Sequence, residues 1–147
     1  MPEQYPRSPK ATVGGIAHLP RLIDKIRMRH AGLIQDYNYL TVGFDKYLLA
    51  FLKLEGAACE AFVARVLEGG SDDEILAWVY ARSRKPTGEE AAQWTSGLLQ
   101  ATPKDDRGRK IFAGYLEDAG RKRGVPVESL PPVATWVDAI ELDEGRL

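Results

Sequence analysis

The chain has 147 residues, of which 44% are hydrophobic and 28% charged, and its formal net charge is −1. This balance is typical of a soluble globular protein and lacks the strong basic excess of a dedicated nucleic-acid-binding domain. The single cysteine, Cys59, excludes an internal disulfide and a cysteine-based zinc site, and no apolar run is long enough to span a bilayer. We therefore expect one cytoplasmic domain over residues 1–147, with neither a membrane nor a nucleic-acid partner.

The N-terminal region begins with prolines and continues into a helix. Residues 1–13 contain three prolines without apolar periodicity and predict an extended arm. The glycine pair at 14–15 predicts a flexible joint. A first helix is predicted over about 20–31, because Pro20 suits the first helical position and Gly32 suits the residue beyond the end. One arc of this helix carries the apolar side chains Leu19, Leu22, Ile23, Ile26 and Leu33.

The rest of the chain also predicts helices. Residues 34–40 alternate apolar and polar side chains but have no partner strand, so we expect an irregular segment there. Apolar spacing and stop signals predict further helices at residues 44–54, 57–70, 71–82, 87–100, 104–122 and about 132–140. With no hairpin signal, the fold class is all-α: six to seven helices, an extended N-terminal arm and an acidic tail over 141–147.

Three helix starts are marked by capping residues. Ser71 with Glu74, and Thr87 with Glu90, have the spacing of capping boxes, in which each side chain bonds the other residue's backbone N–H. Thr102 is predicted to cap the helix over 104–122.

Six short stretches, taken together, resemble one known family. They are PRSP (6–9), GG (14–15), LPRLIDK (19–25), YNY (37–39), SDDEILAWV (71–79) and WVDAIELDEGR (136–146). In this order they are similar to a family of small bacterial proteins that is defined as a domain of unknown function. The resemblance covers nearly the whole chain. It implies a free-standing helical protein and carries no activity onto these residues.

The histidines, the cysteine and the tryptophans favour structural roles. His30 lies near the middle of the apolar arc of its helix and is predicted to be buried, whereas His18 precedes the helix and is predicted to be exposed. These histidines do not have metal-ligand spacing, and no phosphate-binding loop is present, so we expect neither a metal nor a cofactor. Cys59 lies on an apolar stripe and is predicted to be buried and inert. Three side chains are assigned to the core: Trp78, Trp94 and Trp136.

The best functional hypothesis is a small non-catalytic binding or interaction module, with a small molecule or a protein as its partner. The alternative is a small enzyme that acts on an acidic small molecule, with a site around Arg21, Asp24 and Asp138. The candidate ligand-binding residues are His18, Arg21, Asp24, Lys25, Arg29, Tyr37, Tyr39 and Asp138. Sequence alone leaves the oligomeric state open. The two tyrosines could form a stacking platform for a ligand or pack against helices.

One basic ridge is predicted on the first helix. Arg21, Lys25 and Arg29 recur every four residues beside the apolar arc, so their side chains lie close together and repel one another. Residues 138–147 carry four acids and one arginine. We predict either that this segment folds back and neutralises the ridge, bringing Asp138 near Arg21 and Asp24, or that both stay solvated.

Overall fold

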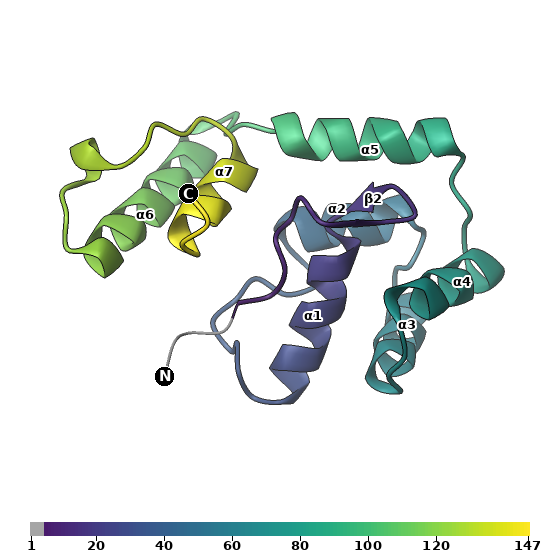
Figure 1. Ribbon diagram of the computed structural model, residues 1–147. Helices are drawn as coiled ribbons and strands as arrows, with labels where there is room; N and C mark the ends of the chain where they lie inside the picture. Colours follow the sequence, from purple (N-terminus) through teal and green to yellow (C-terminus); the bar gives the residue numbers. More distant parts are fainter. Residues whose placement is uncertain (1–4) are drawn as a thin grey trace. The chain divides into compact units, whose positions relative to one another are not determined.

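The computed structural model describes residues 5–147 and confirms an all-α fold (Figure 1). The described chain contains seven α-helices, one short 3₁₀-helix and two two-residue strands. In chain order they are β1 Thr12–Val13, β2 Ile16–Ala17, α1 Leu19–His30, α2 Gly43–Phe51, α3 Ala57–Leu67, α4 Asp72–Arg82, α5 Gly88–Gln100, α6 Asp106–Arg123, η1 Val127–Ser129 and α7 Trp136–Asp143. Residues 34–40 are irregular, as predicted. None of the helices in the described part is both long enough and apolar enough to cross a membrane.

The chain divides into two compact units between Thr95 and Ser96, inside α5. The first unit holds the hairpin and α1 to α4, and the second holds α6, η1 and α7. That residues 1–147 form one domain stays a prediction.

A small hairpin replaces the flexible joint predicted at the glycine pair. Strands β1 and β2 are antiparallel, and Val13 pairs with Ile16 across the turn. Gly14 and Gly15 have φ of 60° and 76°, the left-handed conformation that a two-residue hairpin turn needs at both positions. A Cβ on Gly14 would also lie 2.6 Å from Leu76 Cδ2. The prediction was wrong because these glycines fix a turn. Residues 1–4 of the predicted arm lie outside the described residues.

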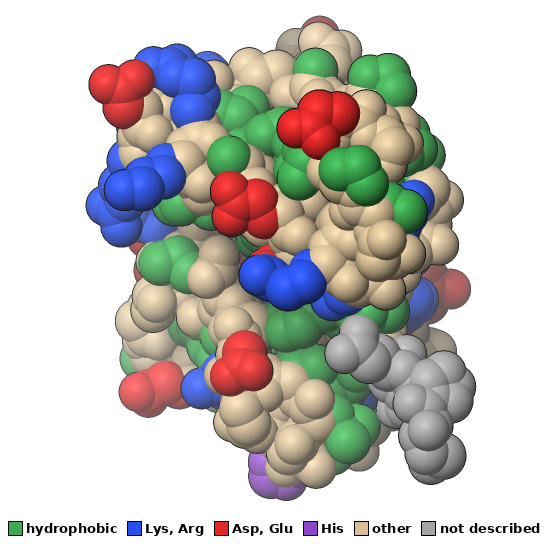
Figure 2. Space-filling view, turned by 90° about the vertical axis from the view of Figure 1, so that its left-hand side faces the viewer, with side chains coloured by type: hydrophobic (Ala, Val, Ile, Leu, Met, Phe, Trp, Pro, Cys, Tyr) green, Lys and Arg blue, Asp and Glu red, His purple; other side chains and the backbone are tan. Residues whose placement is uncertain are grey.

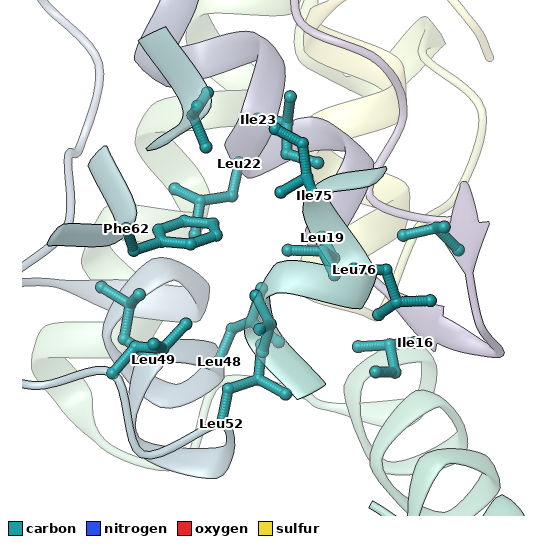
Figure 3. Close-up of a cluster of buried hydrophobic side chains, with 14 of the residues drawn as sticks. Ile16, Leu19, Leu22, Ile23, Leu48, Leu49, Leu52, Phe62, Ile75 and Leu76 are labelled. Carbon is teal, nitrogen blue, oxygen red and sulfur yellow. The ribbon is translucent and has the colours of Figure 1, made fainter. Parts of the chain in front are cut away.

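The core of the first unit is built from apolar side chains at helical spacing (Figure 3). Leu19, Leu22, Ile23 and Ile26 recur every three or four residues on α1, so they share one buried face. Side chains from the hairpin and from α2, α3 and α4 close this face: Ile16, Leu48, Leu52, Phe62, Val66, Ile75 and Val79.

The buried stripe of α2 differs from the prediction in an informative way. Apolar spacing within residues 44–54 predicts a buried stripe of Phe44, Tyr47, Leu48, Phe51 and Leu52, but Tyr47 is 61% exposed. The face that α2 buries instead contains Asp45, Leu48 and Leu49. A carboxylate therefore lies on the core side of this helix.

Capping boxes explain the starts of α4 and α5. Ser71 Oγ accepts from the Glu74 N–H at 3.2 Å, and the Glu74 carboxylate accepts from the Ser71 N–H at 3.1 Å. The same reciprocal bonds join Thr87 and Glu90 at 3.1 and 3.0 Å. Both predicted capping boxes are confirmed.

The predicted cap of α6 was wrong: the helix begins at Asp106, and its cap is Asp105 instead of Thr102. The Asp105 carboxylate caps the helix by accepting from the Gly108 N–H at 2.6 Å, and Thr102 precedes that cap. An acid at this position also complements the helix dipole.

In the second unit, α6 and α7 pack through aromatic rings. The Trp136 ring meets Phe112 and Tyr115 edge to face, with centroid separations of 5.5 and 6.3 Å. Residues 141–143 of the predicted acidic tail complete α7. Two of the acids here are buried, Glu141 and Glu144, and both pair with Arg146. Lys122 of α6 pairs with Asp143 at 3.3 Å. The acids at the chain end therefore have cationic partners within their own unit.

Candidate functional site

A buried cluster of polar groups surrounds the start of α1, where several predicted site residues lie. His18 is the N-cap residue of α1, has a φ of 75° and is only 2% exposed. The prediction of an exposed loop position was wrong because the His18 ring packs against α2, where it meets Asp45 and Phe44. The His18 N–H donates to the carbonyls of Pro9 and Ala11. His30, predicted to be buried, is exposed in the last turn of α1.

Asp45 of α2 is the centre of this cluster. Its Oδ1 lies 2.6 Å from His18 Nε2, and its Oδ2 lies 2.7 Å from Lys25 Nζ. The backbone N–H of Leu40 also donates to Oδ2, at 3.1 Å. Both Lys25 and Asp45 are almost completely buried. The cluster therefore ties α1, α2 and the 31–42 loop together.

The charge states of the cluster follow from its surroundings. Burial would raise the pKa of Asp45, but the hydrogen bond from His18 and the charge of Lys25 hold that pKa below its ordinary value. Burial lowers the pKa of His18, against the raising effect of Asp45. Asp45 is thus ionised, Lys25 neutralises it, and the neutral His18 ring donates its Nε2–H.

Within the part of the chain that the structure describes, one polar atom of the cluster has no hydrogen-bond partner. The Nδ1 atom of His18 is buried and unpaired among the described residues. The ring meets Phe44 edge to face at 5.6 Å. Because Nε2 carries the proton that Asp45 receives, Nδ1 presents a lone pair. It could accept a hydrogen bond from a group that reached it.

The predicted tyrosines lie beside the predicted arginines. The Arg21 guanidinium lies 5.8 Å from the Tyr37 ring centroid, and that of Arg29 lies 4.5 Å from the Tyr39 ring centroid. Both tyrosines are half-buried, and burial raises the pKa of Tyr39. The structure therefore joins four of the predicted residues in two cation–π pairs that hold the loop against α1.

Asp24, another predicted residue, faces an arginine that sequence reasoning missed. Arg7 donates to the Asp24 carboxylate from its backbone N–H at 2.8 Å and from Nε and Nη2 at 3.0 and 3.1 Å. Arg7 also bonds both oxygens of Asp72, at 2.5 and 3.0 Å. These bonds raise the pKa of Arg7 and lower that of Asp72. Arg7 thus joins the arm to α1 and α4.

Asp138 belongs to the second unit. It lies half-buried in the first turn of α7, and its N–H donates to Thr135 Oγ1 at 3.2 Å. Its placement near Arg21 and Asp24, and the docking of the 138–147 segment on the basic ridge, stay predictions.

A second candidate site is a hollow of about 370 Å³ between α3 and α4. Its lining residues are Ala61, Ala64, Arg65, Glu68, Trp78 and Arg82. Trp78, predicted to lie in the core, is half-buried: its ring lies 6.3 Å from the buried Phe62 ring, and the Arg82 guanidinium lies 5.5 Å from its centroid. Cys59, on the same helix as the two alanines, is also only half-buried, and burial raises the pKa of its thiol.

Comparison with protein-family models gives a match over residues 3–146, to a domain of unknown function, DUF5069. The chain belongs to this family. The resemblance seen in the sequence is thereby confirmed at the level of an uncharacterised family. A search of curated proteins finds no match.

The stretches that carried the resemblance have identifiable structural roles in this family member. PRSP supplies Arg7, GG forms the hairpin turn, and LPRLIDK supplies Asp24 and Lys25. SDDEILAWV supplies a capping box and Trp78.

Sequence reasoning missed Asp45, which holds the cluster together. The available signal was its spacing: Asp45 precedes the buried Leu48, Leu49 and Leu52 by three, four and seven residues. An acid on a buried helical face requires a cationic or hydrogen-bonding partner, and the basic ridge on the first helix was a candidate for that partner.

Proposed function

We propose that this protein is a non-catalytic binding module and that its binding surface is the outer face of the α3–α4 helix pair. The observation that carries the proposal is the half-exposed indole of Trp78 in the hollow, beside Arg82. Tryptophan and arginine are the residue types that most often dominate the binding energy of protein interfaces.

The shape of the hollow favours a macromolecular partner over a small molecule. Small-molecule sites enclose most of the ligand surface. Four of the residues that line this hollow are exposed: Ala61, Ala64, Glu68 and Arg82. A shallow surface of this kind is covered effectively only by another protein surface.

The polar groups around α1 support this proposal because they bond to one another within the chain. His18, Lys25 and Asp45 bond one another in a buried cluster, and the Asp24 carboxylate accepts bonds from Arg7. His18, Asp24 and Lys25 were predicted to bind a ligand. We propose instead that they hold the arm and the 31–42 loop in place.

Site-specific photocrosslinking in cells tests the proposal. A photoreactive amino acid at position 64 is expected to give covalent protein adducts, because Ala64 lines the hollow. The matched control is position 92, because Ala92 is also an exposed helical alanine, on α5. Adducts at both positions, or at neither, would contradict a binding surface on α3–α4.

The second candidate function is the small enzyme built around Arg21, Asp24 and Asp138. The buried Nδ1 of His18, which has no hydrogen-bond partner among residues 5–147, favours it, because its lone pair can accept a hydrogen bond from a small acid. A panel of small carboxylic acids should raise the melting temperature if this candidate is right, and should leave it unchanged for the binding module. Loss of the shift in Asp24→Asn would assign it to this site.

We propose a cytoplasmic location, which the single cysteine supports, and no nucleic-acid partner. The net charge of −1 supports the second point, and both acidic and basic side chains appear on the face drawn in Figure 2. A low-salt mobility-shift assay that produced a complex with DNA or RNA would contradict it.

A further inference from the structure

The segment that joins α1 to α2, residues 31–42, contributes little to the core. Only Ile34 of this segment is buried. Its contacts with the rest of the first unit include the two cation–π pairs with Arg21 and Arg29 and the hydrogen bond from the Leu40 N–H to Asp45. Segments with few buried apolar side chains open at a lower free-energy cost than a packed core. Residues 31–42 are therefore suited to open while the rest of the unit stays folded.

Asp45 holds this segment through two residues in an unfavourable backbone conformation. His18 has a φ of 75° and Leu40 a φ of 62°. Both values lie in the left-handed region, which is uncommon for residues with a side chain and is a clear outlier for a bulky one. Such a conformation persists only where surrounding contacts hold it. Here those contacts converge on Asp45, which bonds the His18 ring through Oδ1 and the Leu40 N–H through Oδ2.

The closed cluster has no acceptor for a second proton on the His18 ring. Nε2–H donates to Asp45, and the buried Nδ1 has no partner among residues 5–147. Phe44, which covers the ring from α2, has no polar side-chain atom to offer. A proton on Nδ1 would also add a charge near two cations of α1, Lys25 and Arg21, against the single acid Asp45. The protonated ring therefore requires water that the closed arrangement excludes.

We propose that protonation of His18 opens this cluster, so that residues 31–42 move away from α1 in mildly acidic solution. Water then solvates the charged ring, and Leu40 is released from its positive φ. The movement separates Arg21 from Tyr37 and Arg29 from Tyr39. Cationic side chains of the basic ridge thus become accessible at acid pH. The inference concerns α1 and the segment that follows it, and it is independent of the surface proposed on α3–α4.

Hydrogen exchange of the purified full chain, followed by NMR between pH 7 and pH 5, tests the proposal. Burial keeps the pKa of the closed ring below its ordinary value of 6.5. Opening therefore takes up one proton, and the open fraction rises by up to about tenfold per pH unit below that value. After correction for the direct effect of pH on exchange, protection of the Leu40 amide should fall by at least about tenfold. At both pH values it should stay well below the protection of Phe62 and Val66, in the core.

Two outcomes of this measurement would overturn the proposal. Unchanged protection of the Leu40 amide would show that protonation does not open the segment. Equal protection of Leu40 and the core amides would show that the segment opens only when the whole unit unfolds. The NMR signals of the His18 ring, recorded in the same series, should change with the midpoint of the Leu40 response, and a different midpoint would assign the response to another group.

The only two histidines of the chain provide a matched pair of variants. His18→Asn removes the titrating ring, so protection of the Leu40 amide should change by less than about twofold between pH 7 and pH 5. His30→Asn changes the exposed histidine at the other end of α1 and should keep the full response. Circular dichroism checks that each variant is folded. If His18→Asn does not fold, the comparison of Leu40 with the core amides in the wild type decides the question.

Discussion

Helices α1 and α3 belong to the same unit but differ in which side chains they bury. Helix α1 buries charged groups, including Arg21 and Lys25, whereas α3 exposes an alanine and leucine face. Burial of charge is costly unless the charge is paired, and on α1 Asp45 supplies such a pair for Lys25. We therefore propose that the basic stretch, which looked most functional in the sequence, serves the fold, and that the alanine-rich helix α3 presents the candidate surface.

The strongest way to break this comparison is to remove Asp45. Asp45→Ala leaves Lys25 charged and buried, with His18 and the Leu40 N–H deprived of their acceptor. We expect a loss of about 3–5 kcal/mol in the free energy of unfolding, measured by urea denaturation. Asp36→Ala, at an exposed acid in the adjoining loop, is the control. A loss below about 1 kcal/mol would show that α1 does not depend on the pair.

Acid pH should weaken the α1 cluster through His18. Its folded pKa is lowered below the unfolded value of 6.5, so the unfolded chain binds the proton more tightly. Stability is therefore fully present above that value and falls as pH decreases through it, by at most about 1.4 kcal/mol per pH unit. The pKa of Asp45 is also lowered, so stability falls further as the pH drops below the ordinary Asp pKa of 3.8.

Unfolding free energies at pH 7 and pH 5 check the contribution of His18. His18→Asn should make the unfolding free energy depend less on pH between pH 5 and pH 7, because asparagine does not titrate. Asparagine also tolerates the positive φ at this position. The control is His30→Asn, which changes an exposed histidine and should keep the wild-type dependence. Equal slopes for wild type and His18→Asn would contradict a buried neutral histidine.

The capping boxes join residues that are three apart in sequence and need no tertiary partner. Ser71→Ala and Thr87→Ala should each lower the free energy of unfolding by about 0.5–2 kcal/mol. The two losses should be nearly additive, because the residues start different helices. At the start of α6, Asp105→Ala should cost a similar amount and Thr102→Ala much less, since Asp105 makes the cap. Thermal unfolding that ranks Thr102 above Asp105 would contradict this assignment.

The smallest stability effect is expected on the outer face of α3. Ala64→Arg places a long side chain on an exposed helical position, so the unfolding free energy should change by no more than about 0.5 kcal/mol. A variant that is strongly destabilised would show that this face already has a partner within the chain, and the contrast with α1 would disappear.

Local chemistry made much of the fold predictable. Apolar spacing placed the helices within a few residues, and Ser71 and Thr87 located two helix starts, because capping depends on neighbours three residues apart. The acidic residues at the chain end and the single cysteine could also be read directly from the sequence. The family resemblance, too, was legible in short stretches.

Other features were decided only by tertiary structure. The sequence misplaced both histidines, since burial of His18 depends on packing against Phe44 and Asp45 of α2, and exposure of His30 on where the core ends. Asp45 lies twenty residues from Lys25 and Arg7 sixty-five from Asp72, and no local pattern joins such pairs. Sequence periodicity shows that a helix has an apolar side. Only packing decides which side becomes core and which, as on α3, stays exposed.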